Sequence, residues 1–286
     1  MKRIMLLSTA SLIAFTAAPA SAADLAVAAP VYTKAPMAVV ATVNEWTGLY
    51  IGLNAGGAWG TSHSDVAVTS PGDFFAANCF PDGGQTCWVN TVDVSNAARR
   101  SALTNSGFAG GGQIGYNWQV ANTVWGIEAD INSFNLSMSG ARTVATVNPN
   151  AGTVTVSQSM STNWLATIRG RFGVLVAPQA LLYATGGAAV TSMKSGWTYG
   201  DTRWGNNNAA DFSNTQWGWT AGVGAEYKLS HNWSIGAEYL YVKFDNVSNT
   251  TPVYMKYGSA GPASQNFTQT TDLDAQIVRA KVNYHF

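Results

Sequence analysis

Apolar and polar residues alternate one by one over long parts of this chain. From Val278 to Phe286 every second residue is apolar. The residues between them are polar or charged, namely Arg279, Lys281, Asn283 and His285. Because successive side chains of a β-strand point to opposite faces, this pattern predicts a strand with one apolar and one polar face. Such a strand fits a sheet that packs on a core and faces water, and it fits a sheet that faces lipid equally well.

The same alternation recurs along the chain and predicts eight strands. Their ranges are Trp46–Gly60, 106–120, 124–134, 163–176, 180–192, 215–229, 233–244 and 272–286. The block at 180–192 shows no clear division into two faces. The sequences "ANT", "APQ" and "SHN" form short connections after the second, fourth and sixth strands, and the other connections are long and polar.

Short turns at one end and long loops at the other, with an even strand number, are typical of transmembrane β-barrels. Strands of about 10 residues are long enough to cross the hydrocarbon layer. The predicted fold class is therefore all-β. It is an eight-stranded antiparallel transmembrane β-barrel over residues 46–286, with short periplasmic turns and long extracellular loops.

Aromatic residues support this interpretation, because they gather at the two lipid–water interfaces of a barrel. A soluble β-sandwich would instead distribute its tryptophans through its core. With both chain ends on the short-turn side, the girdle expected there comprises Trp46, Trp118, Trp125, Trp233 and Phe286. The girdle expected on the opposite side comprises Trp59, Trp164, Trp197 and Trp217.

Charge is scarce in this sequence. Charged residues make up 10% of the chain and the formal net charge is zero, whereas about a quarter of the residues of a soluble domain are charged. A neutral chain gives no electrostatic basis for binding nucleic acid. Beyond the first residues, no apolar run approaches the roughly 18 residues of a membrane-spanning helix. We expect no nucleic-acid partner, no cofactor and no metal.

The first residues resemble a targeting segment. A positively charged start precedes the largely apolar stretch 4–18, and small residues follow it. This arrangement is typical of a secretory signal peptide, which we expect at 1–22 with cleavage between Ala22 and Ala23. The Ala-, Val- and Pro-rich segment 23–45 is expected to form a flexible periplasmic tether.

The polar faces of the predicted strands carry charges that a closed barrel would enclose. These lumen residues are Glu128, Asp130, Arg169, Arg171, Glu226, Lys228, Glu238, Arg279 and Lys281. Eight strands leave an interior that side chains just fill, and an unpaired buried charge costs several kcal/mol. A structural salt-bridge network is therefore expected. A constricted ion pathway and a catalytic pair of carboxylates are the alternatives.

Two cysteines lie in the first long loop, in the sequence "CFPDGGQTC". Outside the reducing cytoplasm a disulfide is the expected state of such a pair. We predict that Cys79 and Cys87 are joined. In the chain-entropy model, closing this short loop would stabilise the protein by roughly 2.5 kcal/mol.

Several blocks together resemble one known family. They are "WTGLYIGLNAGGAWG", "GGGQIGYNWQ", "VWGIEADI", "NWLATIRGRFG", "LLYATGGAAV", "AGVGAEYKL" and the terminal "VNYHF". They are similar to the small outer-membrane β-barrel proteins called porin-family or surface-antigen proteins, whose transmembrane domain is like that of OmpA. The resemblance covers about residues 46–286. It implies a location in the outer membrane of a Gram-negative bacterium, a role in envelope integrity and loops exposed at the cell surface.

The resemblance also implies partners. Outer-membrane lipid and lipopolysaccharide would surround the barrel, and the barrel-assembly machinery would read the last strand. The expected insertion signal is the alternating set Val278, Ala280, Val282, Tyr284 and Phe286. Self-association is left open.

The expected function is thus that of a structural outer-membrane barrel without enzymatic activity. A narrow porin-like channel for small solutes or ions is the alternative. An outer-membrane hydrolase is a further one, and it would have to use His63, the one histidine expected on the outer side. Planar-bilayer conductance distinguishes the channel, and assays of lipid or peptide hydrolysis distinguish the enzyme.

Overall fold

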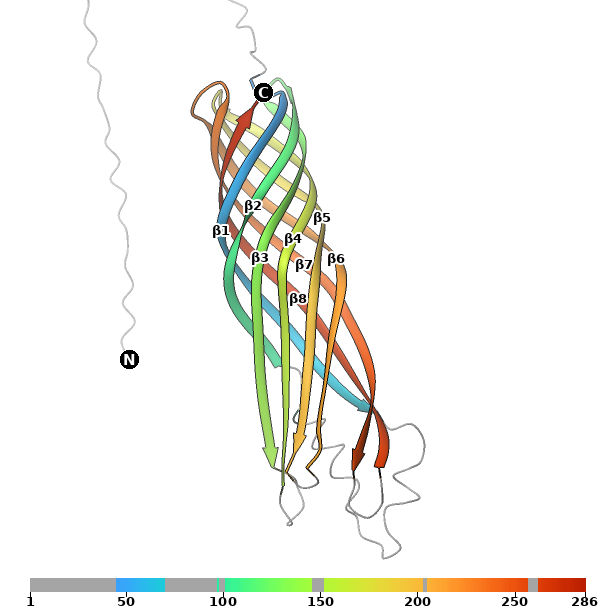
Figure 1. The fold of residues 1–286 in the computed structure, drawn as a ribbon. Helices are drawn as coiled ribbons and strands as arrows, with labels where there is room; N and C mark the ends of the chain where they lie inside the picture. Colours follow the sequence, from blue (N-terminus) through green and yellow to red (C-terminus); the bar gives the residue numbers. More distant parts are fainter. Residues whose placement is uncertain (1–44, 70–96, 98–100, 146–151, 203–204, 257–261) are drawn as a thin grey trace, which may run out of the picture. The chain divides into compact units, whose positions relative to one another are not determined.

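The chain forms a closed antiparallel β-barrel of eight strands (Figure 1). The computed structural model describes residues 45–69, 97, 101–145, 152–202, 205–256 and 262–286. The strands are β1 (Gly48–Thr69), β2 (Ser101–Val120), β3 (Thr123–Ala145), β4 (Thr153–Ala177), β5 (Ala180–Asp201), β6 (Asn207–Lys228), β7 (Trp233–Lys256) and β8 (Pro262–His285). Each strand pairs with the next, and β8 closes the ring on β1. The predicted fold class is confirmed. Within the described ranges, no helix has the length and apolar character needed to cross a membrane.

The strands are longer than the alternating blocks had indicated. All eight extend away from the rim that holds the short turns and the C-terminus, which lies at the top of Figure 1. β4, for example, begins at Thr153 and β5 ends at Asp201. Much of what the sequence analysis assigned to long loops is therefore strand. These segments contain many Thr and Val residues, whose side chains fit the pleated surface of a sheet.

The two faces of the strands exchange character part of the way along their length. In β3 the outward residues from Trp125 to Ile131 are apolar and those from Ser133 to Ser139 are polar, while the inward residues from Glu128 to Asn132 are polar and those from Phe134 to Met138 are apolar. The adjacent strand β4 changes in the same way. This inversion is expected where a strand leaves lipid and enters water, because its outer face must then be polar and its inner face can form an ordinary core. We call this level the boundary.

Bulges in the strands lie at the boundary. The register between β7 and β8 shifts after Phe244, where two residues of β7 oppose one residue of β8. β4 carries a similar irregularity at residues 163 and 164 relative to β5. A bulge bends its strand and increases the local twist. The β6–β7 ladder ends at the pair Gly218–Phe244, directly before the β7 bulge.

Beyond the boundary the barrel divides into two sheets, visible at the bottom of Figure 1. The first leaf is formed by the ends of β3, β4, β5 and β6, and the second leaf by the ends of β7, β8, β1 and β2. The β2–β3 ladder does not extend past Phe134, and the β6–β7 ladder does not extend past Phe244. The two leaves are therefore separated between β2 and β3 and between β6 and β7, and we call these two gaps in the ladders the seams. Asn105 bridges the β2–β3 seam by donating to the carbonyl of Ser137, and Asn214 bridges the β6–β7 seam by donating to Asn249.

The two leaves enclose an apolar core of their own. It comprises Val66, Val154, Val156, Trp197, Tyr199, Val253, Met255 and Phe267. The rings of Trp197 and Phe267 stack with centroids 4.7 Å apart, a contact worth about 1 kcal/mol beyond the area buried. The extracellular end of the barrel is thus built like a small β-sandwich.

The tryptophan girdles are confirmed with two exceptions. Trp118, Trp125 and Trp233 are outward at the short-turn rim, as predicted, and Trp59 and Trp217 are outward at the boundary. Trp197 and Trp46, by contrast, point inward and are fully buried. Trp197 lies beyond the boundary, where inward positions are apolar, so it belongs to the core between the leaves.

Candidate functional site

Within the membrane part of the barrel, the inward side chains form one cluster of opposite charges. The register of the sheet brings them together, because Glu128 of β3 lies directly opposite Arg169 of β4 and Glu238 of β7 opposite Arg279 of β8. Opposite charges on directly paired residues stabilise a sheet. Alternation within each strand then adds the next inward residue two positions along. The resulting charge cluster comprises Glu128, Asp130, Arg169, Arg171, Glu226, Glu238, Arg279 and Lys281.

Arg169 lies at the centre of the charge cluster. Its Nη2 atom is 2.5 Å from Oε1 of Glu128 and 2.7 Å from Oδ2 of Asp130, and its Nη1 atom is 3.2 Å from Oε2 of Glu238. Arg279 contacts two of the same carboxylates, at 2.6 Å to Glu238 and 3.1 Å to Asp130. All of these side chains are buried. Glu128, Asp130 and Glu238 are therefore each shared by two or more cations.

The half of the cluster nearer the periplasm is organised by Arg171, whose Nη2 atom donates to Glu226 at 2.8 Å. Arg171 also donates to the hydroxyl of Tyr50, which in turn donates to Glu128 at 2.7 Å. Tyr183 lies under the guanidinium of Arg171, with its ring centroid 4.1 Å from the central carbon. The Tyr50 hydroxyl thus bridges Arg171 and Glu128, whose charged atoms are 3.8 Å apart.

The cluster is electrically balanced. Its four cations, two from β4 and two from β8, face four carboxylates from β3, β6 and β7. Removing one member would leave an uncompensated buried charge, which costs about 3–5 kcal/mol. Each charged member of the cluster is therefore needed for the stability of the whole cluster.

One predicted lumen residue lies elsewhere. Lys228 does not join the charge cluster; it donates hydrogen bonds to the carbonyl oxygens of Glu45 and His231. It is the last residue of β6 and so lies at the short-turn rim rather than along the barrel wall. There its ammonium group lies 5.3 Å from the ring centroid of Trp46.

Trp46 closes the periplasmic mouth of the barrel. Its indole N–H donates to the carbonyl of Pro178 at 3.1 Å, its backbone N–H donates to Gln119, and its ring packs edge-on against His285. Trp46 was predicted to belong to the aromatic girdle at this rim; it does lie at the rim, but its side chain points inward and is buried. The residue precedes β1, so strand alternation does not fix the direction of its side chain.

On its extracellular side the charge cluster is covered by apolar side chains. This inner core contains Phe134, Leu136, Met138, Met160, Leu165, Met193, Leu240, Val242, Phe244, Leu273 and Ile277. The sequence analysis expected a polar interior along the whole lumen. That expectation holds at the level of the charge cluster, whereas towards and beyond the boundary the interior is an apolar core.

Two of the histidines, His63 and His285, make polar side-chain contacts. His63 of β1 lies on the outer side, where its Nδ1 atom is 3.2 Å from Oδ1 of Asp272. His285 is buried, and its Nε2 atom is 2.9 Å from the hydroxyl of Ser234 and 3.4 Å from Glu226. In a Ser–His–acid triad, each ring nitrogen faces a different partner. Here the same nitrogen faces both, and the Ser234 hydroxyl itself donates to Glu226.

The remaining predicted site residues divide into two groups. Val278, Ala280, Val282 and Phe286 are outward and exposed, and Tyr284 is half-buried, which agrees with the alternation predicted for the last strand. Their role as an insertion signal stays a prediction. Cys79, Cys87, Ala22 and Ala23 lie outside the described residues. No group of three or more potential metal ligands is found among the residues that the structure describes.

Two functional contributions were missed by sequence reasoning. Tyr50 and Tyr183 hold the charge cluster together through their hydroxyl groups. A signal was available for Tyr50, because it occupies a position between the outward residues Leu49 and Ile51. The closure by Trp46 had no such signal, since its contacts join residues far apart in the sequence.

Comparison with known proteins agrees with the fold. Residues 8–286 match the family model of the outer membrane protein β-barrel domain. The chain is 30% identical to the 31 kDa outer-membrane immunogenic protein of Brucella melitensis, over 100% of this chain and 96% of that protein.

Two solved structures match this chain at low sequence identity. The first is the outer membrane protease OmpT from Escherichia coli, with 9% identity, a TM-score of 0.42 and coverage of 84% of this chain and 97% of that one. The second is the outer membrane protein OprG from Pseudomonas aeruginosa, with 12% identity, a TM-score of 0.40 and the same coverage. The family match spans nearly the whole sequence, including every strand of the barrel. The chain belongs to the outer-membrane β-barrel family and is located in the outer membrane of a Gram-negative bacterium.

Proposed function

We propose that this protein is a closed, non-conducting barrel that supports the integrity of the outer membrane and presents its extracellular end at the cell surface. The observation that carries this proposal is the charge cluster, which fills the barrel with four cations and four carboxylates in mutual contact. A passing ion would have to break several charge-assisted hydrogen bonds in a site of low dielectric constant.

Two further layers support a closed interior. Trp46 and its neighbours cover the cluster on the periplasmic side, and the inner core covers it on the extracellular side. Apolar side chains hydrate poorly, so neither layer offers an ion a substitute for water. Closure at three successive levels favours a structural role over the porin-like alternative.

Planar-bilayer recording tests this proposal. The purified wild-type protein is expected to show no sustained conductance, whereas Arg169→Ala combined with Arg171→Ala should admit small ions, because two large side chains and two charges leave the lumen. Lys243→Ala is a matched control, since this cation lies on the outer side and is partly exposed in its pair with Asp274. A stable wide pore in the wild-type protein would contradict the closed barrel.

We also propose that the protein is not an enzyme. The relative from Brucella is named as an immunogenic protein, and the buried contact of Ser234 with His285 lacks the geometry of a triad. His63 is a partly exposed histidine on the outer side of the barrel. Purified protein should therefore show no lipid or peptide hydrolysis; turnover that disappears in His63→Ala would overturn this part of the proposal.

A further inference from the structure

The outward face of the first leaf is a flat surface made of small polar side chains. Rows across β4, β5 and β6 are set by the register, for example Thr155–Gly200–Asn207 and Ser159–Gly196–Asp211. In both rows the central strand contributes a glycine and the flanking strands contribute side chains with hydrogen-bonding groups. A shallow groove therefore follows β5 between two rows of polar side chains, and the outward side chain of Thr198 stands in it between the two glycines.

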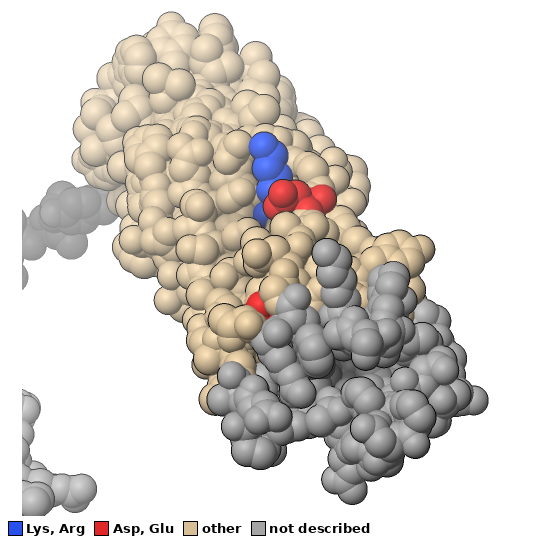
Figure 2. Space-filling model, turned by 60° about the horizontal axis from the view of Figure 1, so that its bottom comes forward, with Lys and Arg blue, Asp and Glu red and all other residues tan. Residues whose placement is uncertain are grey.

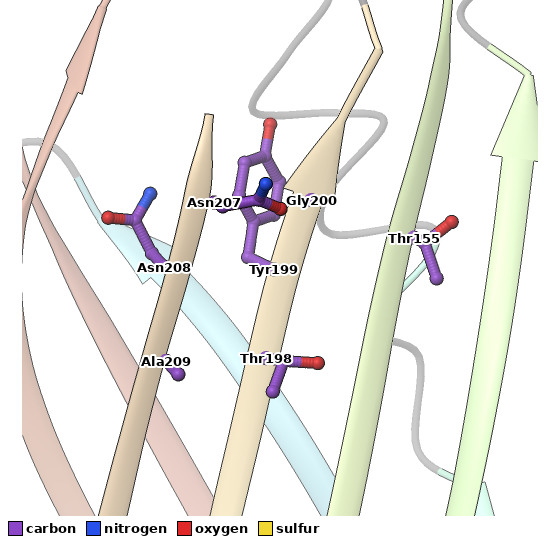
Figure 3. Close-up of a pocket in the computed structure, with 7 residues that line it drawn as sticks. All are labelled: Thr155, Thr198, Tyr199, Gly200, Asn207, Asn208 and Ala209. Carbon is purple, nitrogen blue, oxygen red and sulfur yellow. The ribbon is translucent and has the colours of Figure 1, made fainter. Parts of the chain in front are cut away.

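The structure shows two hollows along this groove. The hollow around Gly200 has a volume of about 410 Å³ and is drawn in Figure 3, where Thr155 and Asn207 stand on either side of β5. The hollow lined by Ser159, Lys194 and Asp211 has a volume of about 350 Å³. These volumes lie within the range of small-molecule sites, roughly 300–1,000 Å³. Gly196 and Gly200 are separated by four residues of extended chain, or about 13 Å.

Gly200 lines the first hollow, and Gly196 lies beside the second, next to its lining residue Ser195. A Cβ atom at Gly200 would lie 3.0 Å from Oδ1 of Asn207, and one at Gly196 would lie 2.3 Å from Oδ1 of Asp211 and 3.2 Å from Oγ of Ser159. The polar ends of the wall residues therefore reach over the floor of the groove. They offer hydroxyl, amide and carboxylate groups within a short distance of each other.

The charge of this face restricts what it can bind. Among the described outward side chains of β4, β5 and β6 beyond Trp217, Lys194 is the one cation and Asp211 the one anion. Figure 2 shows another view of the molecule in which charged side chains are likewise scarce. A phosphate-rich ligand would need several cations. A neutral ligand with many hydroxyl groups needs donors and acceptors in equal measure, which these side chains supply.

The position of the groove identifies the source of such a ligand. Trp217 is outward and exposed at the boundary, where an interfacial tryptophan is expected. The hydroxyl-rich face begins directly beyond it, at Thr215 and Ser213. In the outer leaflet of this membrane, that layer is occupied by the sugars of lipopolysaccharide.

We propose that the β5 groove binds the neutral part of the lipopolysaccharide sugar chain. The inference takes the orientation of the barrel from the proposed envelope role but is independent of whether the barrel conducts. Bound sugar chains would fix a shell of lipopolysaccharide around the first leaf.

The test uses the purified full-length protein in detergent and the core oligosaccharide released by mild acid from lipopolysaccharide of the producing bacterium. Binding is measured by isothermal titration calorimetry, with lipid A from the same preparation as the second probe. Gly200→Val fills the hollow, and Gly186→Val is the matched control. Gly186 is also an outward glycine of β5, but it lies in the lipid-facing part, and a Cβ there would meet only a carbonyl oxygen at 3.5 Å.

The expected result is oligosaccharide binding by the wild-type protein and by Gly186→Val, with a loss of about tenfold or more in affinity for Gly200→Val, equivalent to about 1.4 kcal/mol. All three proteins must show the same far-ultraviolet circular dichroism. Binding of lipid A alone, no binding of the oligosaccharide by the wild-type protein, or equal affinity in all three proteins would overturn the proposal. So would dimerisation of the wild-type protein that Gly200→Val abolishes, since the face would then hold a second copy.

Discussion

Removing the charge of Arg169 is expected to destabilise the barrel strongly. The guanidinium contacts three carboxylates at 2.5, 2.7 and 3.2 Å, and its side chain is fully buried. Arg169→Met keeps most of the volume but leaves three cations against four carboxylates. An uncompensated buried charge costs about 3–5 kcal/mol. We therefore expect the free energy of unfolding to fall by about that amount in urea titrations of protein in lipid vesicles, followed by tryptophan fluorescence.

Two comparisons make this prediction specific. Lys243→Met removes a cation whose side chain is 44% exposed in its pair with Asp274, and it should cost at most about 1 kcal/mol. Combining Arg169→Met with Asp130→Asn removes one charge of each sign, so the double variant should lose clearly less stability than the sum of the two single variants. If Arg169→Met costs no more than Lys243→Met, or if the single effects simply add, the balanced cluster does not hold the barrel together.

Further predictions concern parts of the chain outside the charge cluster. Trp46→Ala should lower the free energy of unfolding by about 3–5 kcal/mol, as for a fully buried aromatic residue, whereas Trp118→Ala, whose ring is 46% exposed, should have a smaller effect in the same titration. Thiol labelling without reductant should detect neither Cys79 nor Cys87 in protein purified from the outer membrane, and labelling of both would contradict the disulfide. Phe286→Ala should reduce insertion in cells while refolding in detergent stays close to normal; equal damage to both would refute an insertion signal.

The architecture could be predicted from the sequence because two-residue periodicity is a local property. Each alternating block, such as the one that ends at Phe286, reports the faces of a strand without reference to its neighbours. The oppositely charged residues could likewise be predicted, since Glu128 and Arg169 lie on the polar faces of their strands. That they touch depends on the register, which the ladder between β3 and β4 fixes only in the folded barrel.

Other features could not be predicted from the local sequence pattern. The closure by Trp46 depends on Pro178, which is far away in the sequence and comes close only when the ring closes. Trp197 was assigned to the outward girdle because the alternation has the same form on both sides of the boundary. Beyond the boundary, however, the apolar face of a strand points inward rather than outward. The seam between β6 and β7 arises from a bulge next to Phe244, and a bulge leaves little trace in composition.

The exchange of faces at the boundary also limits how this sequence can change in length. A single-residue deletion that shifts the register of the whole of β4 by one residue would turn every side chain of the strand to the opposite face, placing Met160 in water and Arg169 in lipid. Both the membrane part and the extracellular part of the strand would then present the wrong face to their surroundings. Length variation among homologous strands should therefore occur in pairs of residues, or at the bulges, where one residue can be gained or lost without reversing the rest.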